Sequence, residues 1–118
     1  EALQVYETVG KTWTMAELME TGEQVYAQAC KSCHQANGQG IPPAFPSLVG
    51  QGLAIGPIDA HIDIVVNGKA GSAMQAFAAQ LNPAEIAAVV TYERNAWGNN
   101  VGDLVQPRAV NALISSKE

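Results

Sequence analysis

The chain has 118 residues, of which 47% are hydrophobic but only 6% aromatic, and its formal net charge is −5. The length fits one domain, and the acidic charge excludes the basic surface of a nucleic-acid-binding protein. No apolar run approaches the roughly 18 residues of a membrane-spanning helix. Because aromatic residues are few and Ala is frequent, we expect another apolar body to fill part of the interior.

The first residues, 1–13, show no steady hydrophobic period, and we interpret them as a linker or N-terminal arm. They lack both Met and a signal-peptide pattern, so we expect a processed protein or an excised domain. Thr14 to Glu17 then form a capping box, which predicts a helix start. Residues at helical spacing carry this helix to Cys30, namely Leu18, Gly22, Val25 and Ala29.

The helix leads directly into Cys30-Lys31-Ser32-Cys33-His34. Two thiols three residues apart, followed by an imidazole, form the attachment motif of a c-type haem. Each thiol adds across one vinyl group, so we expect one haem c bound covalently through Cys30 and Cys33. His34 then lies under the ring as an axial iron ligand. The haem would also fill the interior that the small side chains leave open.

Three other interpretations of this motif fit less well. A thioredoxin-type thiol pair belongs at a strand-to-helix turn, whereas these thiols follow a helical stretch. A structural zinc site needs four ligands, and beyond the motif only His61 remains as a strong donor. A plain disulfide across so short a loop would stabilise little, and it leaves His34 unexplained.

Residues 35–56 are rich in Gly and Pro and predict a long irregular loop of the kind that wraps a ligand. We expect a carbonyl of this loop to accept a hydrogen bond from the His34 nitrogen that does not bind iron. The candidates are Pro42, Pro43 and Pro46. The stretch Phe45-Pro46-Ser47-Leu48 favours Pro46, and it makes Leu48 an expected apolar contact to the haem ring. Alternatively, the prolines only shape the loop.

The short apolar run from His61 to Val66 is compatible with a strand or a helix, and Asn67-Gly68 ends it. His61 offers an alternative axial ligand, which would make a bis-His haem. A lone His at the start of an apolar segment is more typical of an exposed or capping residue.

Residues 68–81 form a second predicted loop, which contains Met74. A Met thioether opposite His34 stabilises ferrous iron and raises the reduction potential, as an electron carrier requires. Met74 is therefore the expected sixth ligand, the alternative being a Met that fills a gap in the core. Met15 and Met19 precede the motif and are interpreted as packing residues.

Asn82-Pro83-Ala84-Glu85 predicts another helix start, because Asn caps, Pro fits the first position and Glu the third. This helix ends at Trp97-Gly98-Asn99, and a short helix is expected from Pro107 to Ile114. Gly22 and Tyr92 are expected where the first and last long helices cross. Trp97 is either a core residue or a hydrogen-bond donor to a haem propionate.

The motif from Cys30 to His34, the Pro-rich loop, the Met74 loop and the helix after Asn82 together resemble a class I, small bacterial cytochrome c over roughly residues 15–97. A narrower resemblance is to the haem c domain of subunit II of certain bacterial haem–copper cytochrome c oxidases. Three stretches carry it: His34-Gln35-Ala36-Asn37-Gly38-Gln39-Gly40, Ala73-Met74-Gln75-Ala76-Phe77 and Val90-Thr91-Tyr92-Glu93-Arg94-Asn95-Ala96-Trp97-Gly98-Asn99.

The resemblance implies an all-α fold with three to five helices wrapped around one covalently attached haem, and it favours a helix for the run from His61. It implies His34 and Met74 as axial ligands. The expected domains are 1–13 as a linker remnant, 14–99 as the cytochrome c domain and 100–118 as a C-terminal extension.

The implied function is electron transfer without catalysis by the chain alone. The domain would accept electrons from a donor cytochrome c or a quinol-oxidising complex and pass them to the dinuclear copper centre of a terminal oxidase. Because haem attachment needs machinery outside the cytoplasm, we expect the periplasmic side of a bacterial inner membrane. The chain would be tethered there through a parent subunit, without inserting into the membrane itself.

Two alternatives remain open. One is a free-standing periplasmic cytochrome c or the haem c domain of another redox enzyme. The other is a haem ligand sensor or peroxidase whose sixth iron site is open.

Overall fold

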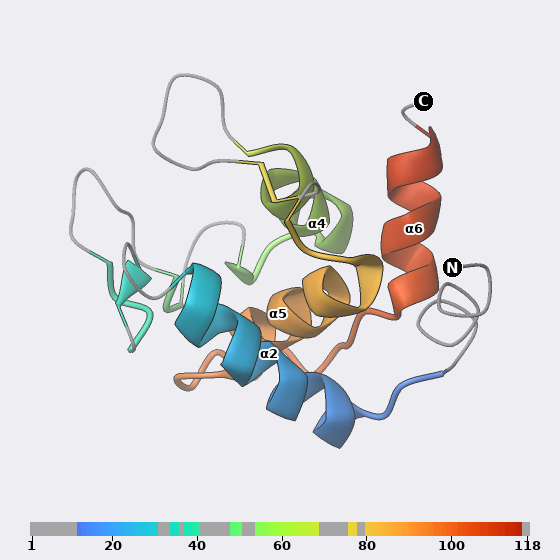
Figure 1. Cartoon of the computed structure of the whole chain (residues 1–118). Coiled ribbons are helices and arrows are strands. Elements are labelled where there is room, and N and C mark those ends of the chain that lie inside the picture. The colour runs from blue at the N-terminus through green and yellow to red at the C-terminus, as the bar shows by residue number, and fades with distance from the viewer. Residues whose placement is uncertain are drawn as a thin grey trace.

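The computed structural model describes residues 12–30, 34–35, 37–40, 48–50, 54–68, 76–77 and 80–116. Within these ranges the chain forms four helices and no strand, which confirms the predicted all-α class. The helices are α2 (Met15–Ala29), α4 (Ile58–Asn67), α5 (Pro83–Asn95) and α6 (Pro107–Ser116). Figure 1 shows α5 at the centre of the molecule, where α2 crosses it. The helices α4 and α6 also pack against α5.

Both predicted helix starts are present, and each is a capping box. The Thr14 hydroxyl accepts a hydrogen bond from the Glu17 N–H (3.2 Å), and the Glu17 carboxylate accepts one from the Thr14 N–H (2.9 Å). Asn82 and Glu85 repeat the arrangement at α5, at 2.8 and 2.9 Å. These side chains satisfy backbone donors that the first turn of a helix leaves without a partner, so the starts of α2 and α5 are fixed locally.

The crossing of α2 and α5 depends on Gly22. A Cβ at this position would overlap the carbonyl oxygen of Ala88 and lie 2.6 Å from the Cβ of Tyr92. Only glycine therefore lets the two backbones approach so closely. This confirms the expectation that Gly22 and Tyr92 mark the crossing point.

The ambiguous apolar run is a helix, α4, as the family resemblance implied. It ends at Asn67 and is capped by Gly68, whose positive φ of 70° is accessible to glycine but strained for a residue with a side chain. The Gly68 N–H donates to the Ile64 carbonyl (2.9 Å). Its buried side chains, which include Ile62 and Val65, face the common core with α5.

The segment before α6 and the helix itself close the other side of the core. Val105 and Val110 are buried, and the Val105 N–H donates to the Thr91 hydroxyl of α5 (2.9 Å). The Gln106 side chain accepts from the Trp13 N–H (2.8 Å) and donates to the Trp13 carbonyl (2.9 Å). Residues from the predicted arm and extension thus contact the helices, while the boundaries of the domain at 14–99 stay a prediction.

No helix in the described part of the chain combines the length and apolar character needed to cross a membrane.

Candidate cofactor site

The Cys-x-x-Cys-His motif begins where α2 ends. Cys30 caps α2 and is only 7% exposed, and its N–H donates to the Tyr26 carbonyl (3.0 Å). The N–H of His34, which is partly buried, donates to the Cys30 carbonyl at 3.0 Å. This spacing of donor and acceptor is that of an α-helical hydrogen bond. The described ends of the motif are thus held one helical turn apart; Cys33 lies outside the described residues.

The segment after His34 folds back on itself. The Gly40 N–H donates to the His34 carbonyl (2.9 Å), and the Gly38 N–H donates to the Gln35 carbonyl (3.1 Å). Gln35 has a φ of 68°, which is uncommon for a residue with a side chain. The Tyr26 hydroxyl donates to the Gln35 carbonyl at 2.5 Å. These bonds fix the backbone on the C-terminal side of His34 against α2.

An aromatic cluster supports this folded segment. The ring centroids of Tyr26, Tyr92 and Trp97 lie 5.0 to 5.6 Å apart, in tilted and edge-to-face pairs. A Cβ at Gly38 would lie 2.6 Å from the Trp97 ring, so Gly38 also has to be glycine. Trp97 is therefore a packing residue, which is one of the two roles predicted for it. Its ring joins the end of α5 to the segment after His34.

The Tyr26 phenol is held in its protonated form. Burial raises its pKa well above the usual value, and the Glu93 carboxylate adds to the rise, followed by Cys30 and Tyr92. A protonated hydroxyl can donate, so the hydrogen bond to Gln35 is the one this environment favours. The pKa of Tyr92 is also raised, mainly by burial and further by Glu23.

Leu48, the expected apolar contact to the haem, lies beside the segment after His34. Its N–H donates to the Gly38 carbonyl (2.6 Å), and its partly buried side chain packs against the core. The Asn99 side chain accepts from the Gly50 N–H (2.6 Å) and donates to the Leu48 carbonyl (2.9 Å). The structure thus brings Cys30, His34 and Leu48 to one end of α2; Pro46 and Met74 lie outside the described residues.

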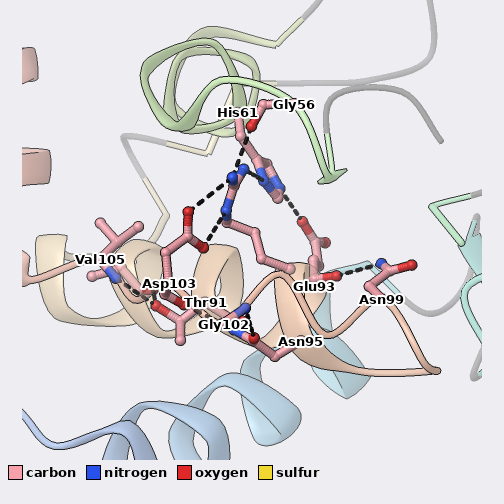
Figure 2. A network of polar contacts seen from close by, with 11 residues as sticks. Gly56, His61, Thr91, Glu93, Asn95, Asn99, Gly102, Asp103 and Val105 are labelled. Atoms are coloured by element: carbon pink, nitrogen blue, oxygen red, sulfur yellow. Dashed lines mark hydrogen bonds and ion pairs between the residues drawn. The ribbon is translucent and has the colours of Figure 1, made fainter. Parts of the chain in front are cut away.

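His61 is buried, at 2% exposure, which corrects the expectation of an exposed or capping residue. Its Nε2 lies 2.7 Å from Glu93 Oε1, and its Nδ1 lies 3.4 Å from Arg94 Nη1 (Figure 2). Because an Arg side chain only donates, Nδ1 accepts and Nε2–H donates to Glu93. Both ring nitrogens are therefore engaged, and the alternative of His61 as an iron ligand is disfavoured.

Arg94 extends this network to two other segments. Its Nε and Nη2 pair with the two oxygens of Asp103 (2.7 and 3.0 Å), and Nη2 also donates to the Gly56 carbonyl (2.7 Å). Figure 2 shows Gly56 and His61 on the side of α4, facing Glu93 and Asp103 on the side of α5. Arg94 is only 3% exposed, so the pairing offsets the cost of burying its charge. Sequence reasoning missed this network, although Glu93-Arg94 stands out at the end of an otherwise apolar helix.

The residues at the end of α2 fit a covalently attached haem by their chemistry. A buried Cys and a partly buried His, one helical turn apart, match the thiol and imidazole that such a group requires. Within the described ranges, no group of three or more His, Cys, Asp or Glu side chains could hold a bare metal ion.

Comparison with known proteins supports this assignment. Residues 17–92 match the family model described as "Cytochrome C oxidase, cbb3-type, subunit III". Cytochrome c-552 of Thermus thermophilus is 40% identical over 92 residues, which cover 66% of this chain and 69% of the relative. The gluconate 2-dehydrogenase cytochrome c subunit of Pantoea cypripedii is 28% identical over 116 residues, or 89% of this chain and 26% of the relative.

A shorter match covers the cytochrome bc1 complex cytochrome c subunit of Mycobacterium tuberculosis, 51% identical over 37 residues, or 31% of this chain and 13% of the relative. The chain thus spans about two thirds of cytochrome c-552, but 26% and 13% of the two enzyme subunits. These relatives support a cytochrome c domain in general, rather than the narrower resemblance to oxidase subunit II. The chain therefore belongs to the cytochrome c family that this model describes, and it is an electron-transfer domain with covalently bound haem c.

Proposed function

We propose that this domain carries single electrons between larger redox proteins, by means of one haem c attached through Cys30 and Cys33 with His34 and Met74 as axial ligands. The haem supplies the one-electron couple of its iron. The observation that carries the proposal is the position of Cys30 and His34, one helical turn apart at the end of α2.

Each residue then has a distinct role. Cys30 anchors the group to the buried end of α2, and His34 binds with its backbone held on both sides by hydrogen bonds to Cys30 and Gly40. Leu48 adds an apolar contact. A carbonyl at Pro46 orients the His34 ring through its other nitrogen. Met74 raises the reduction potential, as suits a carrier that accepts electrons readily.

The relatives favour a free-standing carrier or the cytochrome domain of a larger redox enzyme. Cytochrome c-552 is named as a cytochrome in its own right. The gluconate 2-dehydrogenase and quinone alcohol dehydrogenase relatives are named as cytochrome c subunits of those enzymes. We therefore infer a donor such as a dehydrogenase or a quinol-oxidising complex, and a location on the periplasmic side of a bacterial membrane. Delivery to the copper centre of oxidase subunit II is a narrower form of the same proposal, supported by the three sequence stretches that resemble it.

The experiment that tests the proposal is production of the domain with haem-attachment machinery, followed by denaturation and redox titration. The haem should stay with the denatured chain, at one per chain, and should take up and release one electron reversibly. Cys30→Ala and Cys33→Ala should each weaken this retention, whereas Met19→Ala should not. Haem that separates from the wild-type chain on denaturation would contradict the proposal.

A further inference from the structure

Asn99 makes three side-chain hydrogen bonds that converge from distant parts of the chain. Its Nδ2 donates to the carbonyls of Leu48 (2.9 Å) and Glu93 (2.7 Å), and its Oδ1 accepts from the Gly50 N–H (2.6 Å). Leu48 is 51 residues away along the chain. Both amide hydrogens and the amide oxygen are therefore used, and all three bonds go to backbone groups.

The place of Asn99 explains why an amide is suited to it. The last four carbonyls of a helix have no partner within the helix. At the end of α5 the Tyr92 carbonyl accepts from the Ala96 N–H, and the Arg94 carbonyl accepts from the Val101 N–H. The Glu93 carbonyl between them accepts from Asn99. A carboxylate could not donate to two carbonyls, so an Asp at this position would lose two of the three bonds.

Two successive hydrogen bonds connect the Asn99 side chain, through the backbone of Leu48, to the segment that follows His34. The Leu48 N–H donates to the Gly38 carbonyl (2.6 Å), and Gly38 lies in the segment closed by the bond from Gly40 to the His34 carbonyl (2.9 Å). Gly38 also packs against Trp97, two residues before Asn99. The turn after α5 therefore holds the segment after His34 on one side and residues 48–50 on the other.

We propose that Asn99 is a positioning residue of the haem site, which fixes residues 48–50 against α5 and thereby keeps Leu48 in place beside the segment that follows His34. This inference rests on the proposed function. Without the Asn99 amide, Leu48 and Gly50 lose their hydrogen bonds to the turn after α5, and water gains access to the side of the site where His34 binds. Greater polarity around the group favours its more charged ferric state, so the reduction potential falls.

The test compares the wild-type holoprotein with Asn99→Ala and Asn99→Asp. Asn67→Ala is the matched control, because it removes a side-chain amide that donates within α4, to Asp63 (2.8 Å). Amide exchange of Gly50, the reduction potential and the NMR resonances of the His34 ring are measured for each protein. Loss of the bond accepted by Oδ1 should speed Gly50 exchange about five- to tenfold in Asn99→Ala.

Asn99→Asp keeps that acceptor, so its Gly50 exchange should change less than in Asn99→Ala. Both Asn99 variants should show a lower potential and shifted His34 resonances, whereas Asn67→Ala should match the wild type. Gly50 exchange that speeds up while the potential and the His34 resonances stay at wild-type values would overturn the proposal, because Asn99 would then act only as a helix cap.

The wild type alone provides a second check if the Asn99 variants do not fold. Its Leu48 and Gly50 amides should be protected from exchange, and rapid exchange of both would overturn the inference. A wild type that retains no haem or cannot be reduced reversibly would instead contradict the proposed function, so the two failures are distinguishable.

Discussion

Gly22 sets the distance between α2 and α5. Replacing it with Ala has two opposing effects on stability, a gain in helix propensity and a steric overlap. Gly22→Ala gains about 1 kcal/mol of helix propensity, but its Cβ would overlap the Ala88 carbonyl oxygen and press on Tyr92. Because the Ala88 carbonyl is part of the α5 backbone, it cannot rotate away, and overpacking costs about 1–3 kcal/mol. The overlap should dominate, so the variant should have a lower free energy of unfolding.

Denaturant titration of Gly22→Ala checks this, with Gln24→Ala as the control on the exposed face of the same helix. The control should change the free energy of unfolding by less than about 0.5 kcal/mol. If Gly22→Ala proves more stable than the wild type, then helix propensity outweighs the steric overlap. The statement that only glycine allows the close approach of α2 and α5 would then be wrong.

The buried Tyr26 phenol links stability to alkaline pH. Burial raises its pKa above the usual 10.0 in the folded state, with Glu93 contributing further. Above about pH 10 the unfolded chain loses this proton while the folded chain keeps it, so stability falls as pH rises. Below that range this group contributes no pH dependence.

Tyr26→Phe should cost about 1 kcal/mol near pH 8, because the hydrogen bond to the Gln35 carbonyl is lost. The stability advantage of the wild type should then shrink as pH rises beyond about 10. Denaturant unfolding of both proteins across this range measures the difference. An advantage that stays constant up to about pH 11 would show that the folded phenol titrates normally.

At the scale of elements, the buried network of His61, Glu93 and Arg94 joins α4 to α5. His61 is neutral in this arrangement, so its removal leaves the buried Glu93 carboxylate without the Nε2–H donor, at a cost of about 3 kcal/mol. His61→Ala should therefore destabilise strongly, and the double variant with Glu93→Ala should cost less than the two single changes added. Asp59→Ala, at an exposed position of α4, is the control. Additive single and double effects would mean that the 2.7 Å contact contributes no coupling.

The elements also show what local sequence can and cannot predict. The starts of α2 and α5 were predictable because Thr14 and Asn82 satisfy backbone groups within one turn. The run from His61 was ambiguous because a short apolar stretch suits a strand as well as a helix. The pairing of His61 with Glu93 spans 32 residues, so no local pattern could reveal it.

The candidate site also has features that local sequence predicts and features that it does not. The haem motif was predictable because its spacing is a property of five consecutive residues, and the family comparison confirms the haem c that it implied. The bonds from Asn99 to residues 48–50 depend on how α5 ends, and local spacing carries no signal for them. Cys33, Pro46 and Met74 stay predictions.

At the scale of the whole molecule, the net charge of −5 governs encounters with redox partners. Ionised haem propionates make the holoprotein more negative still. The rate of electron exchange with a cationic metal complex should therefore fall as ionic strength rises, since salt screens the attraction. The rate with an anionic complex should rise under the same change.

Stopped-flow rates at about 0.01 M and 0.15 M ionic strength test this, because the screening length falls from about 30 to 8 Å between them. An uncharged reductant is the control, and its rate should not change. Rates that fall with salt for the anionic complex would indicate a positive patch at the site of electron exchange.

The most direct test of the central claim is the optical spectrum of the holoprotein in both oxidation states, beside Met74→Ala and with Met19→Ala as the control. A six-coordinate carrier predicts a methionine-to-iron charge-transfer band in the ferric wild type and in Met19→Ala. Ferrous wild type should bind carbon monoxide poorly, and Met74→Ala should lose the band and bind it readily. A wild type that lacks the band and takes up carbon monoxide freely would contradict the account, because its sixth site would be open as in a sensor or peroxidase.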